Sequence, residues 1–335
     1  MVTSSSPRVV AGRPGVVPIL LAALLWGTTG TAAHFLPGNV SPLATGAASM
    51  GVGGALLFAL SARGAWVTLR DRRVRTWVLA GVAGIVMYPL AFYSAMNLAG
   101  VAVGTVVSLG SAPVFAAGIE FLTERRAVTR LWVLCTLLAL LGTVLVAGGQ
   151  SDPAAGFASL GVLLGLLAGL SYALYTHASY QVIAGGHSSR ATMGALFGAG
   201  AVCLMPVLAA TGAPLLQSAG SLGITVYLIV GPMVVAYLLF GRGLRTVRGS
   251  TATSITLVEP LVATLSAVLI VGERLPPTGW AGLGLVLVAV TVLVTNPGTT
   301  MRVGSRTPAG VASVARRKPC LVTGSLTRCH FRSPT

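Results

Sequence analysis

Charged side chains are scarce in this sequence. Only 8% of its 335 residues are charged, six are acidic, and Lys318 is the single lysine. An ordinary soluble domain carries about 25% charged residues, so this composition excludes that class. Because 54% of the residues are hydrophobic, we expect a membrane protein.

Groups for catalysis and cofactor binding are also scarce. The four cysteines have no paired spacing, and cysteine and histidine form no cluster with the spacing of metal ligands. The apolar segments contain no aspartate, and the sequence has no glycine-rich phosphate loop. We therefore expect no metal, no cofactor and no enzymatic activity.

Long hydrophobic runs dominate instead. Ten apolar stretches of about 20 residues follow one another, the length that an α-helix needs to cross about 30 Å of hydrocarbon. A β-barrel would show short alternating segments, which this sequence does not have. The sequence thus predicts an all-α polytopic membrane protein. The predicted spans are 16–35, 42–62, 77–98, 101–122, 130–148, 157–182, 191–211, 221–241, 251–272 and 277–296.

A net charge of +16 could indicate nucleic acid binding, so the position of the basic residues decides its meaning. The arginines between spans lie on one side of a ten-span chain, with Arg274 as the single exception. This is the positive-inside bias. It predicts a multi-pass plasma membrane protein with both termini cytoplasmic, lipids as neighbours and no nucleic acid partner.

The two halves of the chain resemble each other at an offset of 146 to 149 residues. Three rare features match in register: Pro113 with Pro260, Glu124 and Arg125 with Glu273 and Arg274, and Trp132 with Trp280. Each half holds five spans, an odd number, so the second half must cross the membrane in the opposite orientation. Inverted repeats around a midplane site are typical of secondary transporters.

This repeat sets the predicted organisation of the chain. A basic tail follows the last span, and because it is poor in large apolar residues we expect it to be disordered and to touch anionic lipid. The predicted parts are a cytoplasmic N-terminal segment (1–15), a first five-helix repeat (16–148), a linker (149–156), a second five-helix repeat (157–296) and the cytoplasmic tail (297–335).

Two motifs resemble those of a known family. The first span contains LLWGTTG, residues 24–30, and the ninth contains EPLVATLSAVLIVGERL, residues 259–275. With ten spans in two repeats, the chain resembles the EamA family of the drug/metabolite transporter superfamily. The first half departs from the pattern, because its segment from Pro113 to Arg125 is shorter and carries an extra Glu120. The resemblance implies transport of a small metabolite and leaves the substrate open.

A carboxylate and a proline stand side by side in the ninth span. On a helix, Glu259 shares a face with small or polar residues such as Thr256 and Ser266, so this face should line protein or water. Pro260 has no amide hydrogen, and the carbonyl of Thr256 should therefore lose its helical partner. We expect helix breaks at Pro260 and at Pro113 in the fourth span, both beside a central cavity.

Three roles remain open for Glu259. A carboxyl group that is withdrawn from water binds a proton more readily, so Glu259 could accept and release a coupling proton. It could also bind an amine of the substrate directly. The structural alternative is that it bonds to neighbouring backbone and helps to pack the broken helix.

Aromatic and amide side chains give further candidates for substrate contact. Trp26 and Tyr172 occupy equivalent positions in the two repeats and can stack on a substrate or donate a hydrogen bond. Each of these side chains can equally serve packing alone. The binding candidates besides Glu259 and Thr256 are Trp26, Tyr172, Tyr93, Asn97 and Tyr237.

Polar residues near the ends of spans are expected to be structural. Glu120 and Glu124 lie close to Arg125 and Arg126 in the sequence, so we expect ion pairs among them at the membrane interface. His177 is likewise expected at an interface.

Charge also restricts the predicted cargo. Arginines cluster at the predicted cytoplasmic ends, so a central cavity should lack the fixed positive charge that phosphorylated substrates need. We expect export of an amino acid, amine or drug-like compound by alternating access. The alternatives are translocation of a lipid or lipid-linked head group, or transport of another metabolite class. Small-xxx-small patterns in the sixth and seventh spans favour close helix packing, within one chain or between copies in a homo-oligomer.

Overall fold

The computed structural model describes residues 15–99, 101–125, 127–148, 158–272 and 276–295. The predicted linker and tail, nearly all of the predicted N-terminal segment, and Arg274 lie outside these residues. Every regular element in the described part of the chain is helical, which confirms the predicted fold class.

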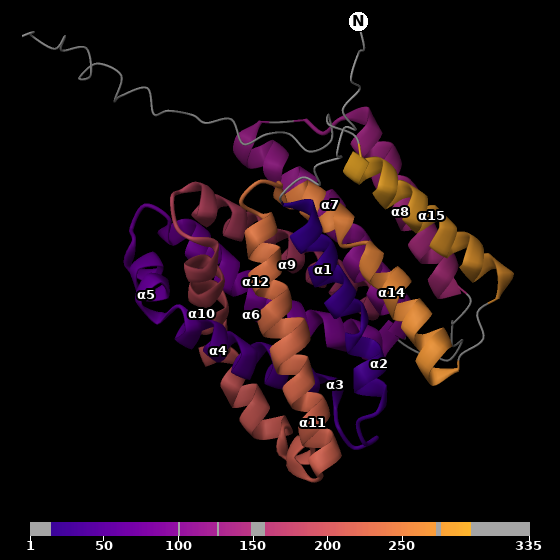
Figure 1. Ribbon diagram of the computed structural model, residues 1–335, viewed down its shortest axis with the longest axis horizontal. Helices are drawn as coiled ribbons and strands as arrows, with labels where there is room; N and C mark the ends of the chain where they lie inside the picture. Colours follow the sequence, from indigo (N-terminus) through magenta and orange to yellow (C-terminus); the bar gives the residue numbers. More distant parts are fainter. Residues whose placement is uncertain (1–14, 100, 126, 149–157, 273–275, 296–335) are drawn as a thin grey trace, which may run out of the picture. The chain divides into compact units, whose positions relative to one another are not determined.

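The first half supplies five membrane-crossing segments, whose helices are labelled in Figure 1. Two of them consist of several short helices joined end to end, and three are single helices. The segments are α1 (Val16–Gly27) with α2 (Thr29–His34), α3 (Pro42–Ala47) with η1 (Ala48–Val52) and α4 (Gly53–Leu60), α6 (Arg75–Ala99), α7 (Val101–Glu124), and α8 (Arg130–Gly148).

The second half supplies five more segments. They are α9 (Ala158–Ala184), α10 (Ser189–Thr211), α11 (Ala219–Leu228) with η3 (Ile229–Val235) and α12 (Ala236–Gly243), α13 (Gly249–Ile255) with α14 (Val258–Ser266) and η4 (Ala267–Val271), and α15 (Pro277–Thr295). Within the described ranges, nine of the ten segments are long and apolar enough to cross a membrane, and the remaining apolar helix, Arg130–Val146, is shorter.

The two halves interlock in a symmetric way. Helix α9, which opens the second half, packs on α6 and α7 of the first half, and α1, which opens the first half, packs on α12 and α14 of the second. The remaining helices pair across the halves as α8 with α15 and α4 with α10. Each half therefore completes the other, as expected for inverted repeats.

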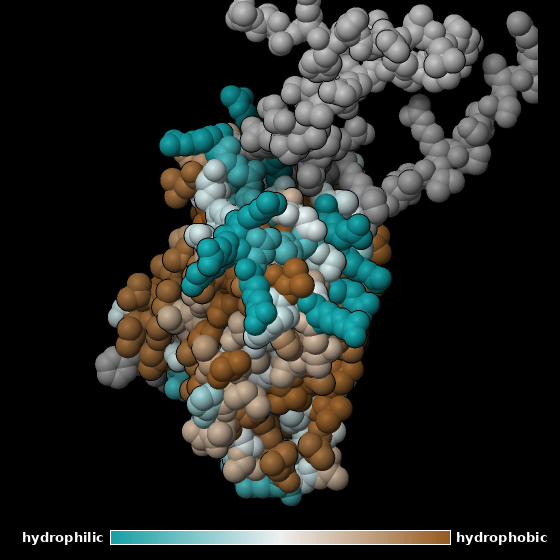
Figure 2. Space-filling model, turned by 90° about the vertical axis from the view of Figure 1, so that its left-hand side faces the viewer, coloured by the Kyte–Doolittle hydropathy of each residue, from teal (hydrophilic) through white to brown (hydrophobic). Residues whose placement is uncertain are grey.

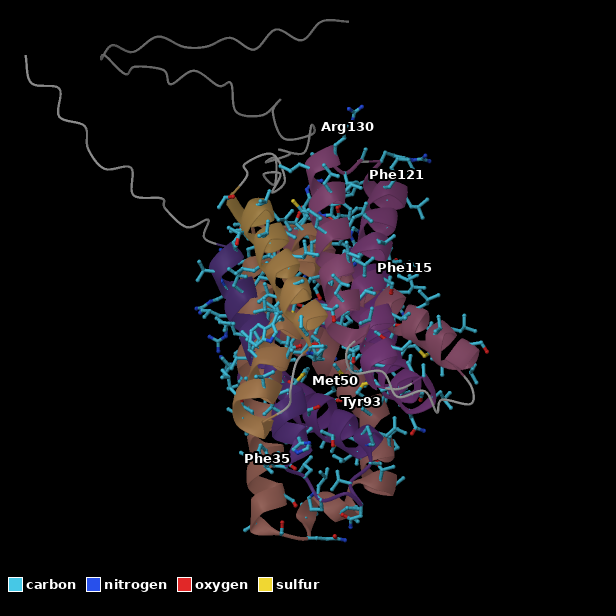
Figure 3. The ribbon with its side chains drawn as sticks, turned by 90° about the vertical axis from the view of Figure 1, so that its right-hand side faces the viewer. Phe35, Met50, Tyr93, Phe115, Phe121 and Arg130 are labelled. Carbon is cyan, nitrogen blue, oxygen red and sulfur yellow. The ribbon has the colours of Figure 1, made fainter. Side chains whose placement is uncertain are left out.

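Contacts between connections show that the chain alternates between two ends of the bundle. At one end, the Ser61 hydroxyl donates to the Arg190 carbonyl at 3.1 Å, which joins the α4–α5 turn to the start of α10. At the other end, Asn39 donates to Gln217 at 3.0 Å. Figure 3 shows Arg130 and Phe35 at these opposite ends. The first is called the arginine-rich end below, because it holds the arginine-bearing connections.

One α-helix was not expected from the sequence. The arginine-bearing connection between α4 and α6 folds into α5 (Ala62–Arg70). Ala65 and Thr68 face the protein, whereas Trp66 and Val67 are exposed. In Figure 2, hydrophilic side chains gather towards one end of this face above a broad hydrophobic surface. An amphipathic helix beside such a boundary is suited to lie in the membrane interface.

Helices α8 and α15 approach each other through two glycines. A Cβ atom added at Gly282 would lie 2.5 Å from the carbonyl oxygen of Gly142, and one added at Gly142 would lie 2.6 Å from the carbonyl oxygen of Gly282. Backbones this close leave no space for a side chain, which is how small residues bring membrane helices together.

The Gly282→Ala substitution should therefore destabilise the protein. We expect a lower midpoint of thermal unfolding in detergent, because overpacking a tight contact costs about 1–3 kcal/mol. Gly284→Ala on the same helix is the matched control, since nothing lies within 4 Å of a Cβ at that position. Equal midpoints for the two variants would contradict this packing.

Candidate functional site

The ninth membrane segment is interrupted directly before Glu259. Helix α13 ends at Ile255, and α14 begins at Val258. Between them, Thr256 and Leu257 have ψ angles near zero, −7° and −6°. Glu259 thus lies in the first turn of a new helix, where the helix dipole favours a negative charge.

The backbone at this break differs from the expectation. The Thr256 carbonyl has a partner after all, because it accepts the amide hydrogen of Glu259 at 2.8 Å. This hydrogen bond, which closes a tighter three-residue turn, replaces the helical hydrogen bond that Pro260 cannot donate. The expected break at Pro113 is also wrong, because α7 continues through Pro113 as one helix.

Glu259 lies deep among protein atoms and yet remains partly accessible. This combination fits a side chain that lines a narrow internal space. Within the described residues, the ionisable groups in electrostatic range of its charge are the phenols of Tyr88, Tyr93, Tyr172 and Tyr237. Neither an arginine nor a histidine is among these described neighbours.

Hydroxyl groups of the tyrosines around this segment are fixed in pairs. The hydroxyl groups of Tyr172 and Thr256 lie 2.9 Å apart, and Thr256 donates its own hydrogen to the Thr253 carbonyl at 2.9 Å. Tyr172 must therefore be the donor to Thr256. The hydroxyl groups of Tyr175 and Tyr237 form a second pair at 3.0 Å.

Trp26 is held against the same cluster by a distorted helix. Its indole nitrogen donates to the Pro232 carbonyl at 2.8 Å, within the π-helical segment η3. Its ring lies 5.0 Å from that of Tyr237 and 5.2 Å from that of Phe240. With its single donor already used, Trp26 can offer only a ring face or edge to a ligand.

The structure gathers six of the seven predicted binding candidates and leaves one apart. Glu259, Thr256, Tyr172, Tyr237 and Trp26 are connected as described above. Tyr93 belongs to the group because it lies within electrostatic range of Glu259. Its ring packs against Gly46 of α3. Asn97 is exposed one turn further along α6, and no contact joins it to the cluster in the described part of the chain.

One tyrosine of the cluster, Tyr88, was not predicted. Tyr88 lies 5.7 Å from Tyr172 and 6.0 Å from Tyr175 between ring centroids. The repeat could have indicated Tyr88, because it precedes the predicted candidate Tyr237 by 149 residues, an offset of the repeat. Tyr175 stands one helical turn after Tyr172 on α9, and this spacing places both rings on one face.

Burial changes sharply at Glu259 along the ninth segment. Every residue from 249 to 258 is buried, whereas most residues from 259 to 268 are partly exposed. The segment is therefore sealed towards the arginine-rich end and more open beyond the carboxylate.

A buried polar network forms this seal. Glu120 of α7 accepts hydrogen bonds from the Ser250 amide at 2.8 Å and from the Ser250 hydroxyl at 2.7 Å. Glu124 accepts from Gln181 at 2.8 Å and lies 4.0 Å from the Arg248 guanidinium. The network ties together α7, α9 and the start of α13.

The positions of two network residues correct the sequence analysis. Glu120 is 4% exposed and bonds to Ser250, so it is a buried group at the start of α13 and not an interfacial residue. His177 was also expected at an interface, but it is fully buried, and its ring lies 5.2 Å from that of Trp77.

Known proteins resemble this chain in sequence and in fold. The sequence matches the EamA-like transporter family over residues 13–148 and again over residues 159–295. The chain belongs to this family. The two matches confirm the resemblance, and they make the chain a membrane transporter of the drug/metabolite type.

Individual relatives cover most of this transporter. A Bacillus subtilis (strain 168) protein, named uncharacterized transporter YwfM, is 34% identical over 284 residues, which is 83% of this chain and 93% of that protein. A Salmonella typhimurium protein, named uncharacterized inner membrane transporter YicL, is 23% identical over 288 residues, which is 84% of this chain and 95% of that protein.

A solved crystal structure has the same fold. It superposes with a TM-score of 0.69 at 21% sequence identity and covers 83% of this chain and 96% of the other.

Removing the Glu120 carboxylate should weaken the seal. In Glu120→Ala, the buried amide and hydroxyl of Ser250 lose their acceptor, and each unsatisfied group costs about 1–3 kcal/mol. We expect a clear fall in the thermal midpoint in detergent. Glu120→Gln is the control, because its amide can still bond to both groups, and it should lie close to wild type. A Glu120→Ala variant as stable as Glu120→Gln would contradict the assignment.

Proposed function

We propose that this transporter exports a small amine-bearing metabolite, such as an amino acid, an amine or a drug-like cation, in exchange for protons. Glu259 is the shared binding site of the amine and the proton. The two inverted halves expose this site to the two sides of the membrane in turn.

The observation that carries this proposal is the surroundings of Glu259. A single carboxylate lies within electrostatic range of the phenol groups of four tyrosines, Tyr88, Tyr93, Tyr172 and Tyr237. An ammonium group can form a charge-assisted hydrogen bond with a carboxylate and a cation–π contact with rings around it. The absence of a described basic neighbour disfavours phosphorylated or other anionic cargo.

The structural role considered for Glu259 has little support. In the described part of the chain, its carboxyl group makes no hydrogen bond to backbone or side chain. A carboxylate that only packed the broken helix would need such partners, because a buried charge without them is costly. Glu259 is therefore available to a ligand.

Competition for one carboxylate would couple the transport of the amine to the transport of the proton. Glu259 can hold a proton or neutralise an ammonium group, and binding of one excludes the other. The concentration of arginines at one end supports a cytoplasmic position for that end in a plasma membrane transporter, with both termini on the same side. A proton that binds Glu259 from the outside would then release the amine on that side. The proton would be carried inward when the transporter changes its orientation again.

Replacing Glu259 tests this exchange. We expect Glu259→Gln to lose pH-gradient-driven accumulation of a radiolabelled amine or amino acid in proteoliposomes. Its amine affinity should fall about 10- to 100-fold, because a hydrogen bond to a charged group contributes about 1.5–3 kcal/mol. Asp71→Asn, which removes a carboxylate at the arginine-rich end, is the control and should retain coupled transport.

Particular outcomes would overturn the proposal. Full gradient-driven accumulation by Glu259→Gln would exclude the carboxylate as the coupling site. Preferred transport of phosphorylated compounds over amines would contradict the proposed cargo. Movement of fluorescent lipids without any solute movement would favour a lipid translocator.

A further inference from the structure

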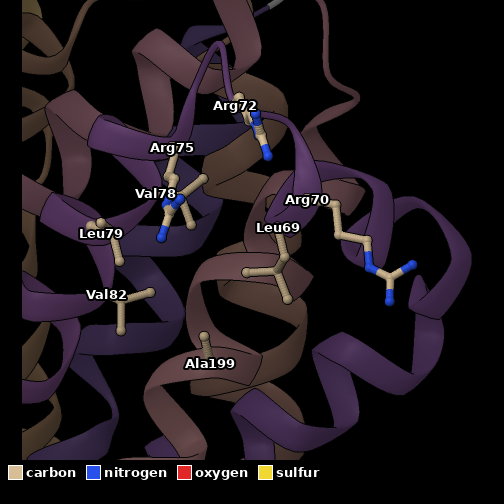
Figure 4. A pocket seen from close by; sticks show the side chains of 8 residues that line it. All are labelled: Leu69, Arg70, Arg72, Arg75, Val78, Leu79, Val82 and Ala199. Atoms are coloured by element: carbon tan, nitrogen blue, oxygen red, sulfur yellow. The ribbon is translucent and has the colours of Figure 1, made fainter.

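A pocket of about 380 Å³ lies apart from the Glu259 site, at the arginine-rich end. It is formed by the end of α5, the turn into α6, the first turns of α6, and Ala199 of α10 (Figure 4). Arg72 and Arg75 stand over one side of the pocket, and Leu79 and Val82 lie deeper along α6. Cationic groups thus sit directly above an apolar floor.

The charges at this pocket are not neutralised by any carboxylate in the part of the chain that the structure describes. In the described residues, no ion pair joins Arg70, Arg72 or Arg75 to a carboxylate. The nearest acidic residue in the sequence, Asp71, has both carboxylate oxygens engaged. One accepts from the Arg73 amide at 2.9 Å, and the other lies 3.0 Å from the Nε2 atom of His187.

These contacts also fix the turn that carries the arginines. The Arg73 amide and the His187 ring hold the pKa of Asp71 below its usual value, so the carboxylate stays ionised at neutral pH. His187 binds the Thr68 hydroxyl through Nδ1 at 2.9 Å. The turn between α5 and α6 is thereby anchored to the connection before α10, and the arginines beside it are free to bind an external anion.

The surroundings of the pocket indicate that it opens towards lipid. Trp66 of α5 is 49% exposed and carries the Arg70 guanidinium 4.6 Å above its ring. Leu79, which lines the pocket, is 59% exposed. Tryptophan and arginine are typical of the membrane–water interface, and an exposed leucine below them continues into the hydrocarbon region.

We propose that this pocket binds the head group of an anionic phospholipid from the leaflet at the arginine-rich end. The phosphate lies between Arg72 and Arg75, since arginine binds phosphate oxygens through paired N–H donors. The start of an acyl chain lies along Leu79 and Val82. A free phosphate ion would use the arginines alone and would gain nothing from the apolar floor.

Bound lipid would join the two halves of the transporter. The pocket is built from α5 and α6 of the first half and Ala199 of the second. A lipid seated there contacts both halves, so it favours the arrangement in which α6 and α10 lie together.

Native mass spectrometry of the purified transporter can test this site. The protein is mixed with equal amounts of phosphatidylglycerol and phosphatidylcholine, and retained lipid is counted for each variant. Arg72→Gln/Arg75→Gln should bind phosphatidylglycerol roughly 10- to 30-fold more weakly, because each arginine near a membrane surface contributes about a fivefold factor. Val82→Phe, which fills the apolar floor without changing charge, should also weaken binding.

The matched control removes the same charge outside the pocket. Arg63 and Arg73 are exposed and do not line it, so Arg63→Gln/Arg73→Gln should bind like wild type. Equal losses in both double variants, or undiminished binding in Arg72→Gln/Arg75→Gln, would overturn the site. Displacement of the lipid by millimolar inorganic phosphate would show an anion site without lipid specificity and would also overturn it. Thermal midpoints confirm that each variant is folded.

Discussion

An ionisable carboxyl group deep in an apolar bundle must be surrounded by protein or water, because hydrocarbon cannot solvate it. The structure around Glu259 follows from this constraint. The helix is interrupted just before it, and tyrosines from α6, α9 and α12 converge on it. Small residues such as Ala263 and Ser266 continue the same face of the helix. The regular membrane helix is therefore interrupted where the carboxylate must be accommodated.

The proposed exposure of this site to both sides rests on the inverted repeat, but the two halves are not interchangeable. The position equivalent to Glu259 in α7 is an alanine, Ala112, and α7 is unbroken. The first half contributes Glu120 instead, which fastens the start of α13. One half therefore carries the proposed binding carboxylate, and the other supplies a contact that closes the arginine-rich end.

Periodicity and rare residues were enough to predict the ten spans, the repeat and most of the residues gathered at Glu259. Local sequence could not predict the buried position of Glu120, because nearby arginines suggest a solvated ion pair, whereas its hydrogen-bond partner Ser250 lies 130 residues away. Helix α5 was missed because arginines in a short connection resemble a loop. The predicted helix break at Pro113 was wrong because the effect of a proline on a membrane helix depends on the packing around the freed carbonyl.

The most direct test of the account is whether water reaches the face of α14 beyond Glu259. A variant lacking the other cysteines can carry either Ala263→Cys or the native Cys203, which is exposed within α10 at the apolar surface. A membrane-impermeant thiol reagent applied to sealed vesicles should label residue 263 from the side opposite the arginine-rich end and leave Cys203 unlabelled. Labelling of Cys203 with protection of residue 263 would contradict a water-accessible chamber beside Glu259.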